Sequence, residues 1–124
     1  MAANKIVRIG PVPLTAVLTT NILNPPSLTG GAGLAGTNTG TYLVLRHFRV
    51  TNKTAAIVTF SMFLGASGGN VAGTEVFGSV SSVPANSSID WYGMLRMDVA
   101  DYLVGGAASA SALTFEAEAE LGVA

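Results

Sequence analysis

The sequence contains no cysteine and a single histidine. These absences exclude disulfide bonds, thiol nucleophiles and thiolate metal sites, and one chain cannot assemble a multi-histidine metal site. Long apolar runs are also missing, because the best candidate, residues 55–66, is shorter than the ~18 to 20 residues that a membrane-spanning helix needs. Pro11 and Pro13 interrupt the apolar part of residues 1–18, which argues against a signal peptide. We therefore expect no membrane partner.

Charged residues are also scarce. Lys, Arg, Asp and Glu make up 10% of the residues, against about 25% in an average soluble domain, and none of them occurs in residues 9–45 or 54–74. A free protein normally carries more charge to resist association, so we expect much of this surface to lie against other subunits, including copies of the same chain. Six basic residues and a net charge of −1 argue against a nucleic-acid partner, since such binding releases several counterions per site.

The sequence does show an alternation of apolar and polar residues. Helix signals are nearly absent, and short segments with a period of two recur between clusters of Gly, Asn, Ser and Pro. This pattern predicts an all-β fold, an antiparallel β-sandwich or jelly roll. We interpret residues 41–52 and 55–65 as a hairpin that turns at Asn52-Lys53-Thr54. Further strands are expected at residues 74–80, 87–95 and 111–124, and a helical turn or bent strand at residues 97–106.

The N-terminal third differs in composition from the rest. A first strand is expected at residues 5–9, and residues 24–40 are rich in Gly, Thr, Asn and Pro, which is unusual inside a compact domain. We expect residues 10–40 to form an extended arm that is ordered mainly by contact with other subunits. The predicted organisation is a single domain, with an N-terminal strand and arm over residues 1–40 and a sandwich core over residues 41–124.

Three glutamates, Glu116, Glu118 and Glu120, occupy every second position of the last expected strand. They should project from one face, about 7 Å apart, while the residues between them face the core. A metal or acid–base site would need ligands from other strands or a shared desolvated pocket, so we interpret the row as a solvated or ion-paired face. The expected core residues of this strand are Phe115, Ala117, Ala119 and Leu121. The expected cationic partners are Arg46, Arg49 and Lys53.

His47 is the one residue with the chemistry of a general base at neutral pH. Strict alternation places it on one face with Leu43 and Leu45, and Phe48 on the other, so this strand should be covered on both sides. No G-x-S-x-G elbow accompanies it, and we interpret it as a partly buried structural histidine. Residues 31–36, GAGLAG, match G-x-G-x-x-G, but no helix is expected to follow them, which argues against a nucleotide site.

Two surface hypotheses remain open. The basic residues around His47 could contact nucleic acid, although the charge balance is against it. An exposed aromatic pair at Trp91 and Tyr92, with Asp90 and Asn86, would suit sugar stacking, whereas a core position for the aromatics is the more common arrangement. No catalytic, cofactor-binding or metal-binding residues are predicted, no cofactor is expected, and the chain is not expected to be an enzyme.

Residues 45–78 and 83–122 resemble small β-sandwich virion proteins of tailed bacteriophages. The stretches that carry the resemblance are RVTN…TFSMFLGA, the Ala-Asn-Ser-Ser turn that enters DWYG, and the terminal ALTFEAEAEL. The resemblance implies a non-enzymatic structural protein of the virion, assembled in the host cytoplasm, whose partners are the major capsid protein or other virion subunits. No site residues carry over from it, and residues 10–40 have no counterpart.

Within a virion, the hypothesis that we favour is that the chain is a capsid decoration (cement) protein that binds and stabilises the head, because the domain is small and the expected arm is apolar. A tail or head–tail connector component is the first alternative. A carbohydrate-binding β-sandwich module is the second, with Trp91, Tyr92, Asp90 and Asn86 as its platform.

Overall fold

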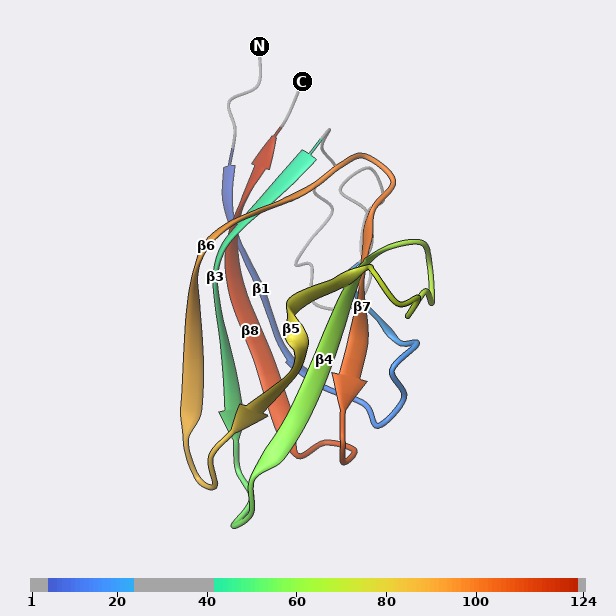
Figure 1. Ribbon diagram of the computed structural model, residues 1–124. Coiled ribbons are helices and arrows are strands. Elements are labelled where there is room, and N and C mark those ends of the chain that lie inside the picture. Colours follow the sequence, from blue (N-terminus) through green and yellow to red (C-terminus); the bar gives the residue numbers. More distant parts are fainter. Residues whose placement is uncertain (1–4, 24–41, 123–124) are drawn as a thin grey trace.

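The computed structural model describes residues 5–23 and 42–122, which form eight β-strands and no helix (Figure 1). Consequently no helix in these two ranges could cross a membrane. The predicted all-β class is therefore confirmed. In chain order the strands are β1 (Lys5–Pro13), β2 (Asn21–Leu23), β3 (Tyr42–Asn52), β4 (Val58–Gly65), β5 (Glu75–Val83), β6 (Ser88–Met97), β7 (Tyr102–Ala107) and β8 (Leu113–Gly122).

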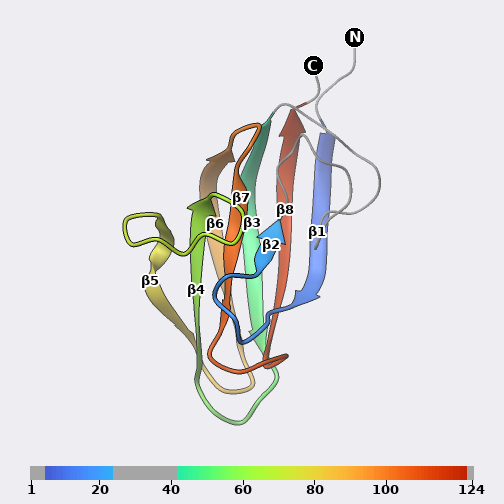
Figure 2. The same cartoon turned by 90° about the vertical axis from the view of Figure 1, so that its right-hand side faces the viewer.

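The strands form two four-stranded antiparallel sheets that face each other (Figure 2). Sheet A has the order β1-β8-β3-β6, and sheet B has the order β2-β7-β4-β5. Each strand of the first half pairs with its counterpart counted from the other end: β1 with β8, β2 with β7, β3 with β6 and β4 with β5. This is the connectivity of a jelly roll, in which a long double strand is wrapped into a sandwich.

The core lies between the sheets and is built by alternation along each strand. On β8, the four residues Phe115, Ala117, Ala119 and Leu121 are buried, as predicted. The Phe115 ring stacks on the Phe48 ring of β3, with centroids 5.6 Å apart. The Phe48 ring also packs edge-to-face against the ring of Phe60, which lies in the opposite sheet, with centroids 6.4 Å apart. Aromatic contacts of this kind therefore join the two layers.

The predicted hairpin of residues 41–52 and 55–65 is wrong. β3 and β4 lie in different sheets, and the segment between them crosses the end of the sandwich. The crossing is held by Asn52, whose buried side chain donates to the carbonyls of Ala56 and Val83 and accepts from Thr54. The turn residues correctly predict where the chain turns, but they cannot distinguish a hairpin turn from a turn between sheets. Of the pairs of described strands that follow each other in the chain, only β4 and β5 are hydrogen-bonded neighbours.

The expectation that β3 is covered on both faces is also wrong. The register of β3 against both neighbours shifts between Leu45 and His47. This irregularity at Arg46 changes the phase of the alternation, so that Leu43, Leu45, Phe48 and Val50 all face the core. The charged residues of the strand and His47 are left on the outer face.

The N-terminal segment belongs in part to the sandwich. Val12 pairs with Phe115 across β1 and β8, and Leu14, Ile22 and Leu23 are buried in the core. The arm predicted over residues 10–40 is therefore wrong for residues 10–23, whose core contacts were hidden because Gly10 and two prolines interrupt the alternation. Residues 24–40, including the Gly-rich GAGLAG, lie outside the described residues.

Between β1 and β2, residues 14–20 lie against β7. The amide of Ala107 donates to Thr15 O and that of Gly105 donates to Thr20 O. A Cβ at Gly106 would approach Thr15 O within 2.6 Å and Val17 O within 2.7 Å, so only glycine admits this segment. The backbone around Thr15 and Val17 therefore covers part of the outer side of sheet B at Gly106.

Candidate functional site

The charged residues of the chain are distributed unequally between the two sheets. Nine of the thirteen lie in strands of sheet A, and one, Glu75, lies in a strand of sheet B. We call the outward side of sheet A the charged face. Its polar residues come from all four strands: Arg8, Arg46, His47, Arg49, Asp90, Arg96, Glu116, Glu118 and Glu120.

The glutamate row runs along the middle of the charged face. Its carboxylates point outward, as predicted, because β8 lies between β1 and β3 and the alternate residues fill the core. Glu120 pairs with Arg46 at 3.5 Å. Glu118 lies opposite Arg8 on β1 and opposite His47 on β3. Cations on both neighbouring strands therefore offset the repulsion within the row.

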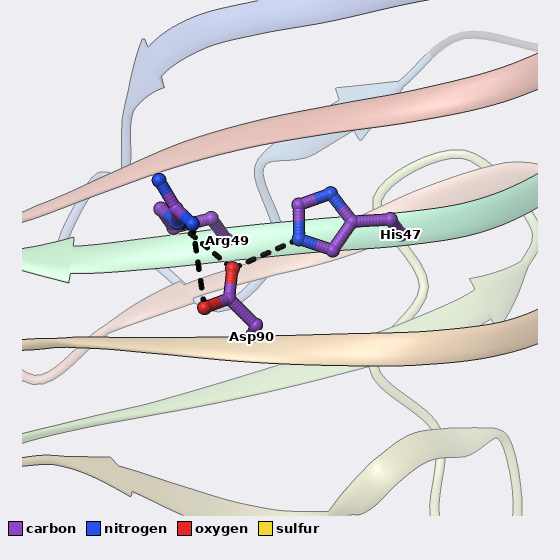
Figure 3. Close-up of polar contacts among 3 residues, drawn as sticks. All are labelled: His47, Arg49 and Asp90. Carbon is purple, nitrogen blue, oxygen red and sulfur yellow. Dashed lines mark hydrogen bonds and ion pairs between the residues drawn. The ribbon is translucent and has the colours of Figure 1, made fainter.

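Asp90 of β6 is the centre of the second cluster (Figure 3). Arg49 donates from Nε to Oδ1 at 2.8 Å and from Nη2 to Oδ2 at 3.5 Å. His47 Nε2 lies 2.8 Å from the same Oδ1. The hydrogen bond from Arg49, followed by that from His47, lowers the pKa of the Asp90 carboxyl, and the carboxylate in turn raises the pKa of Arg49. Asp90 is therefore held as a carboxylate.

The cluster has the geometry of an ion-pair network. His47 Nε2 is directed at Asp90, and its ring stacks on Tyr92 with centroids 4.7 Å apart. In the described part of the chain, none of the contacts of His47 is with a serine or threonine hydroxyl. The open hollow beside it, about 220 Å³, is lined by Arg8 and Glu118 among others and stays exposed to water. Within residues 5–23 and 42–122, no group of three His, Asp or Glu residues could hold a metal ion.

The predicted sugar platform is not assembled. Trp91 faces inward and stacks on Phe48 with ring centroids 5.5 Å apart. Asp90 and Tyr92 point to the opposite side of β6, and Asn86 lies in the turn before that strand. Because the alternation of β6 separates the two aromatic rings, they do not form one stacking surface.

The other side of the molecule carries almost no charge. We call the outer side of sheet B, together with residues 14–20 and 66–74, the uncharged side. Its strands bury Phe63 and Val104 outside the core, and Val17, Leu18 and Val71 are exposed on its loops. A hollow of about 290 Å³ lies here and is lined without a charged group: Ala16, Leu18, Thr59, Phe60, Ser61, Gly106, Ala107 and Ala108.

The structure brings together only some of the residues considered from the sequence. Arg46 and Arg49 lie beside the glutamates, as expected, but Arg49 bonds to Asp90, and Lys53 lies beyond the end of β3. Arg8 and the contact between Asp90 and His47 were missed. Arg8 could have been found from the alternation of residues 5–9, whereas the Asp90 contacts require that β3 and β6, which are far apart in sequence, be neighbours.

The fold class is now defined: an eight-stranded jelly roll, an architecture that occurs in viral capsid domains, lectins and cupins. No family model and no curated protein matches the chain. Among solved structures, it is similar to the Tobacco streak virus coat protein dimer at 11% identity and a TM-score of 0.46, over 98% of this chain and 87% of that one. A second crystal form of the same coat protein gives 11% identity and a TM-score of 0.40, over 98% and 86%. We draw neither function nor partners from likenesses of this degree.

Proposed function

We propose that the chain is a non-enzymatic structural protein of a tailed-phage virion, and specifically a decoration protein that binds and stabilises the assembled head. Two observations support this role besides the resemblance of residues 45–78 and 83–122. The jelly roll is an architecture of virion proteins, and the charged face has the contacts of a structural network.

The observation that carries the proposal is the charge asymmetry between the two sheets. A surface that remains in water favours charged side chains, and the charged face has this character. The uncharged side presents exposed Val17, Leu18 and Val71, and it contains a hollow whose lining, which includes Leu18, has no charged group. Subunit contacts are depleted of charge at their centre, so the uncharged side is the surface that we assign to the major capsid protein.

The proposal is tested with heads from a phage that lacks this chain. Val17→Lys places a charge on the uncharged side, and Ile6→Lys is its matched control, because both residues are β-branched and are 57% and 60% exposed. We expect purified protein to cosediment with the heads, Val17→Lys to weaken this binding at least about tenfold, and Ile6→Lys to bind as the unchanged protein does. Equal loss in both variants, or no binding of the unchanged protein, would contradict the assignment.

A tail or connector role predicts a different location. In that case the protein would be absent from the shell and confined to one vertex or to the tail, which labelling of the protein in electron micrographs distinguishes from decoration of the whole head.

A further inference from the structure

β5 contains a bulge that its partner strand does not follow. Phe60 of β4 pairs with Ser81, and Met62 pairs with Val76, so a step of two residues on β4 is matched by a step of five on β5. Residues 77–80 of β5 therefore lie opposite a single residue of β4. Figure 1 shows the bulge as a kink about halfway along the ribbon of β5. Because β5 is the edge strand of sheet B, no described strand pairs with its other side.

Phe77 begins the bulge and places its ring between the two sheets. The ring packs edge-to-face against Phe48 of β3, with centroids 4.6 Å apart, and against Trp91 of β6, with centroids 4.7 Å apart. Both partners belong to sheet A, whereas Phe77 belongs to sheet B. β5 and β6 are the edges of different sheets and share no ladder. Phe77 therefore closes the core on a side of the sandwich where the sheets are joined by side chains alone.

This closed position of Phe77 is held against the preference of its backbone. Its φ is 63°, a conformation that bulky residues rarely adopt because the Cβ atom approaches the following carbonyl oxygen. Gly78, which could adopt it at little cost, is the next residue instead. The described contacts that offset the strain are the two ring contacts and one hydrogen bond, in which Ser81 Oγ donates to the carbonyl of Phe77 at 2.7 Å. Opening of the bulge would relieve the strain.

The rings that Phe77 covers have other contacts that hold them in place. The Trp91 ring stacks on Phe48 with centroids 5.5 Å apart, and it lies against Gly93, where a Cβ would come within 2.7 Å of it. Phe48 in turn packs against Phe60 and Phe115. Withdrawal of the Phe77 ring therefore uncovers part of Trp91 and leaves the rest of the aromatic cluster assembled.

We propose that the bulge of β5 is a plug that opens separately from the rest of the sandwich. In the open form, residues 77–80 move outward with the Phe77 ring, the pairs of β5 with β4 on both sides of the bulge stay formed, and solvent reaches Trp91 between the two sheets. The open form is a minor state of about 1–10%, and it exchanges with the closed form in microseconds to milliseconds. This inference goes beyond the proposed virion role and does not depend on it.

Two serine variants test how the plug is held closed. Ser81→Ala removes the hydroxyl that bonds to the carbonyl of Phe77. Ser82→Ala is the matched control, because it removes the same group from the next residue, which is exposed and makes no described side-chain hydrogen bond. Loss of one hydrogen bond should raise the ratio of open to closed protein about two- to tenfold in Ser81→Ala, whereas the control should keep the ratio of the unchanged protein.

Relaxation-dispersion NMR measures this ratio and the exchange rate. We expect one common exchange rate for the backbone amides of residues 76–81 and for the indole N–H of Trp91, and flat profiles for residues 115–121 of β8. Flat profiles at Trp91 in both the unchanged protein and Ser81→Ala overturn the proposal. Equal ratios in the two serine variants also overturn it, as does exchange of residues 115–121 at the same rate, because the sandwich would then open as a whole.

Fluorescence gives an independent test, because Trp91 is the only tryptophan in the chain. Phe77→Ala removes the plug, so acrylamide should quench Trp91 at least about twofold more strongly than in the unchanged protein. Ser82→Ala should be quenched as the unchanged protein is, and far-UV circular dichroism verifies that each variant is folded. Equal quenching in folded Phe77→Ala and in the control would show that Phe77 does not shield Trp91, which overturns the proposal.

Discussion

At the residue scale, the fold depends on a few polar side chains whose partners lie far away in the sequence. Asn52 is 1% exposed, and its Nδ2 joins the end of β3 to Ala56 and to Val83 at the end of β5, while its Oδ1 accepts from Thr54. No buried side-chain nitrogen or oxygen in the described residues lacks a hydrogen-bond partner. Removing one member of such an arrangement leaves others unpaired, which costs more than the bond itself contributes.

Replacing Asn52 with alanine should therefore lower the free energy of unfolding by about 2–4 kcal/mol, because the variant removes the side-chain donor to the buried carbonyl of Val83, one of two donors to Ala56 O, and the acceptor of Thr54. Asn70→Ala is the control: it removes the same amide from an exposed loop residue, and we expect a change within about 0.5 kcal/mol. Urea denaturation of both variants measures the difference. An Asn52→Ala protein as stable as the control would show that the crossing is held by other contacts.

Asp90 gives a prediction of acid sensitivity. Hydrogen bonds from Arg49 and then from His47 lower its pKa in the folded state, so folding favours the ionised form. The resulting stabilisation is present above the unfolded-state pKa of about 3.9 and is lost as the pH falls through the lower folded value. Asp90→Asn should therefore lose less stability than the unchanged protein between about pH 5 and pH 2.5.

The control for this comparison is Thr51→Ala, which alters an exposed residue of the neighbouring strand β3 and leaves every charge in place. It should follow the acid dependence of the unchanged protein. Denaturant titrations at each pH provide the values, and parallel curves for Asp90→Asn and the unchanged protein would show that the cluster does not favour the ionised carboxyl.

At the element scale, β8 is the strand that the sequence describes most completely. Its two neighbours are β1 and β3, and it buries one set of alternate residues while it exposes the other. Phe115→Ala should lower the free energy of unfolding by about 3–5 kcal/mol, because a fully buried ring would be removed from its stack on Phe48.

The opposite face of β8 provides the matched comparison. Glu118→Gln keeps the size of an exposed side chain, and we expect a change below about 0.5 kcal/mol. Thermal or chemical unfolding of both variants measures the contrast. Unfolding of the glutamine variant, together with tolerance of Phe115→Ala, would mean that the two faces of the strand are reversed.

Single strands also show which structural features could be predicted from the sequence and which could not. Alternation indicated β8 and its outward glutamates correctly, because that pattern is local. It failed at β3, where one irregular residue, Arg46, changes the phase. It failed again between β3 and β4, since the sheet to which a strand belongs depends on partners such as β6, which lies about 40 residues away. For the same reason the glutamate row could be predicted and the Asp90 cluster could not.

At the scale of the whole molecule, the jelly roll separates charge from apolar surface. The low content of charged residues in the sequence suggested contact with other subunits. The fold places most of these charged residues in sheet A and leaves sheet B nearly uncharged.

Cryo-electron microscopy of heads to which the purified protein has been added would show whether the protein decorates a phage head through its uncharged side. We predict density for the jelly roll on the outside of the shell, with β2, β7 and β4 toward the capsid and the glutamates of β8 toward solvent. Density confined to the tail or connector, or a jelly roll whose charged face contacts the shell, would contradict it.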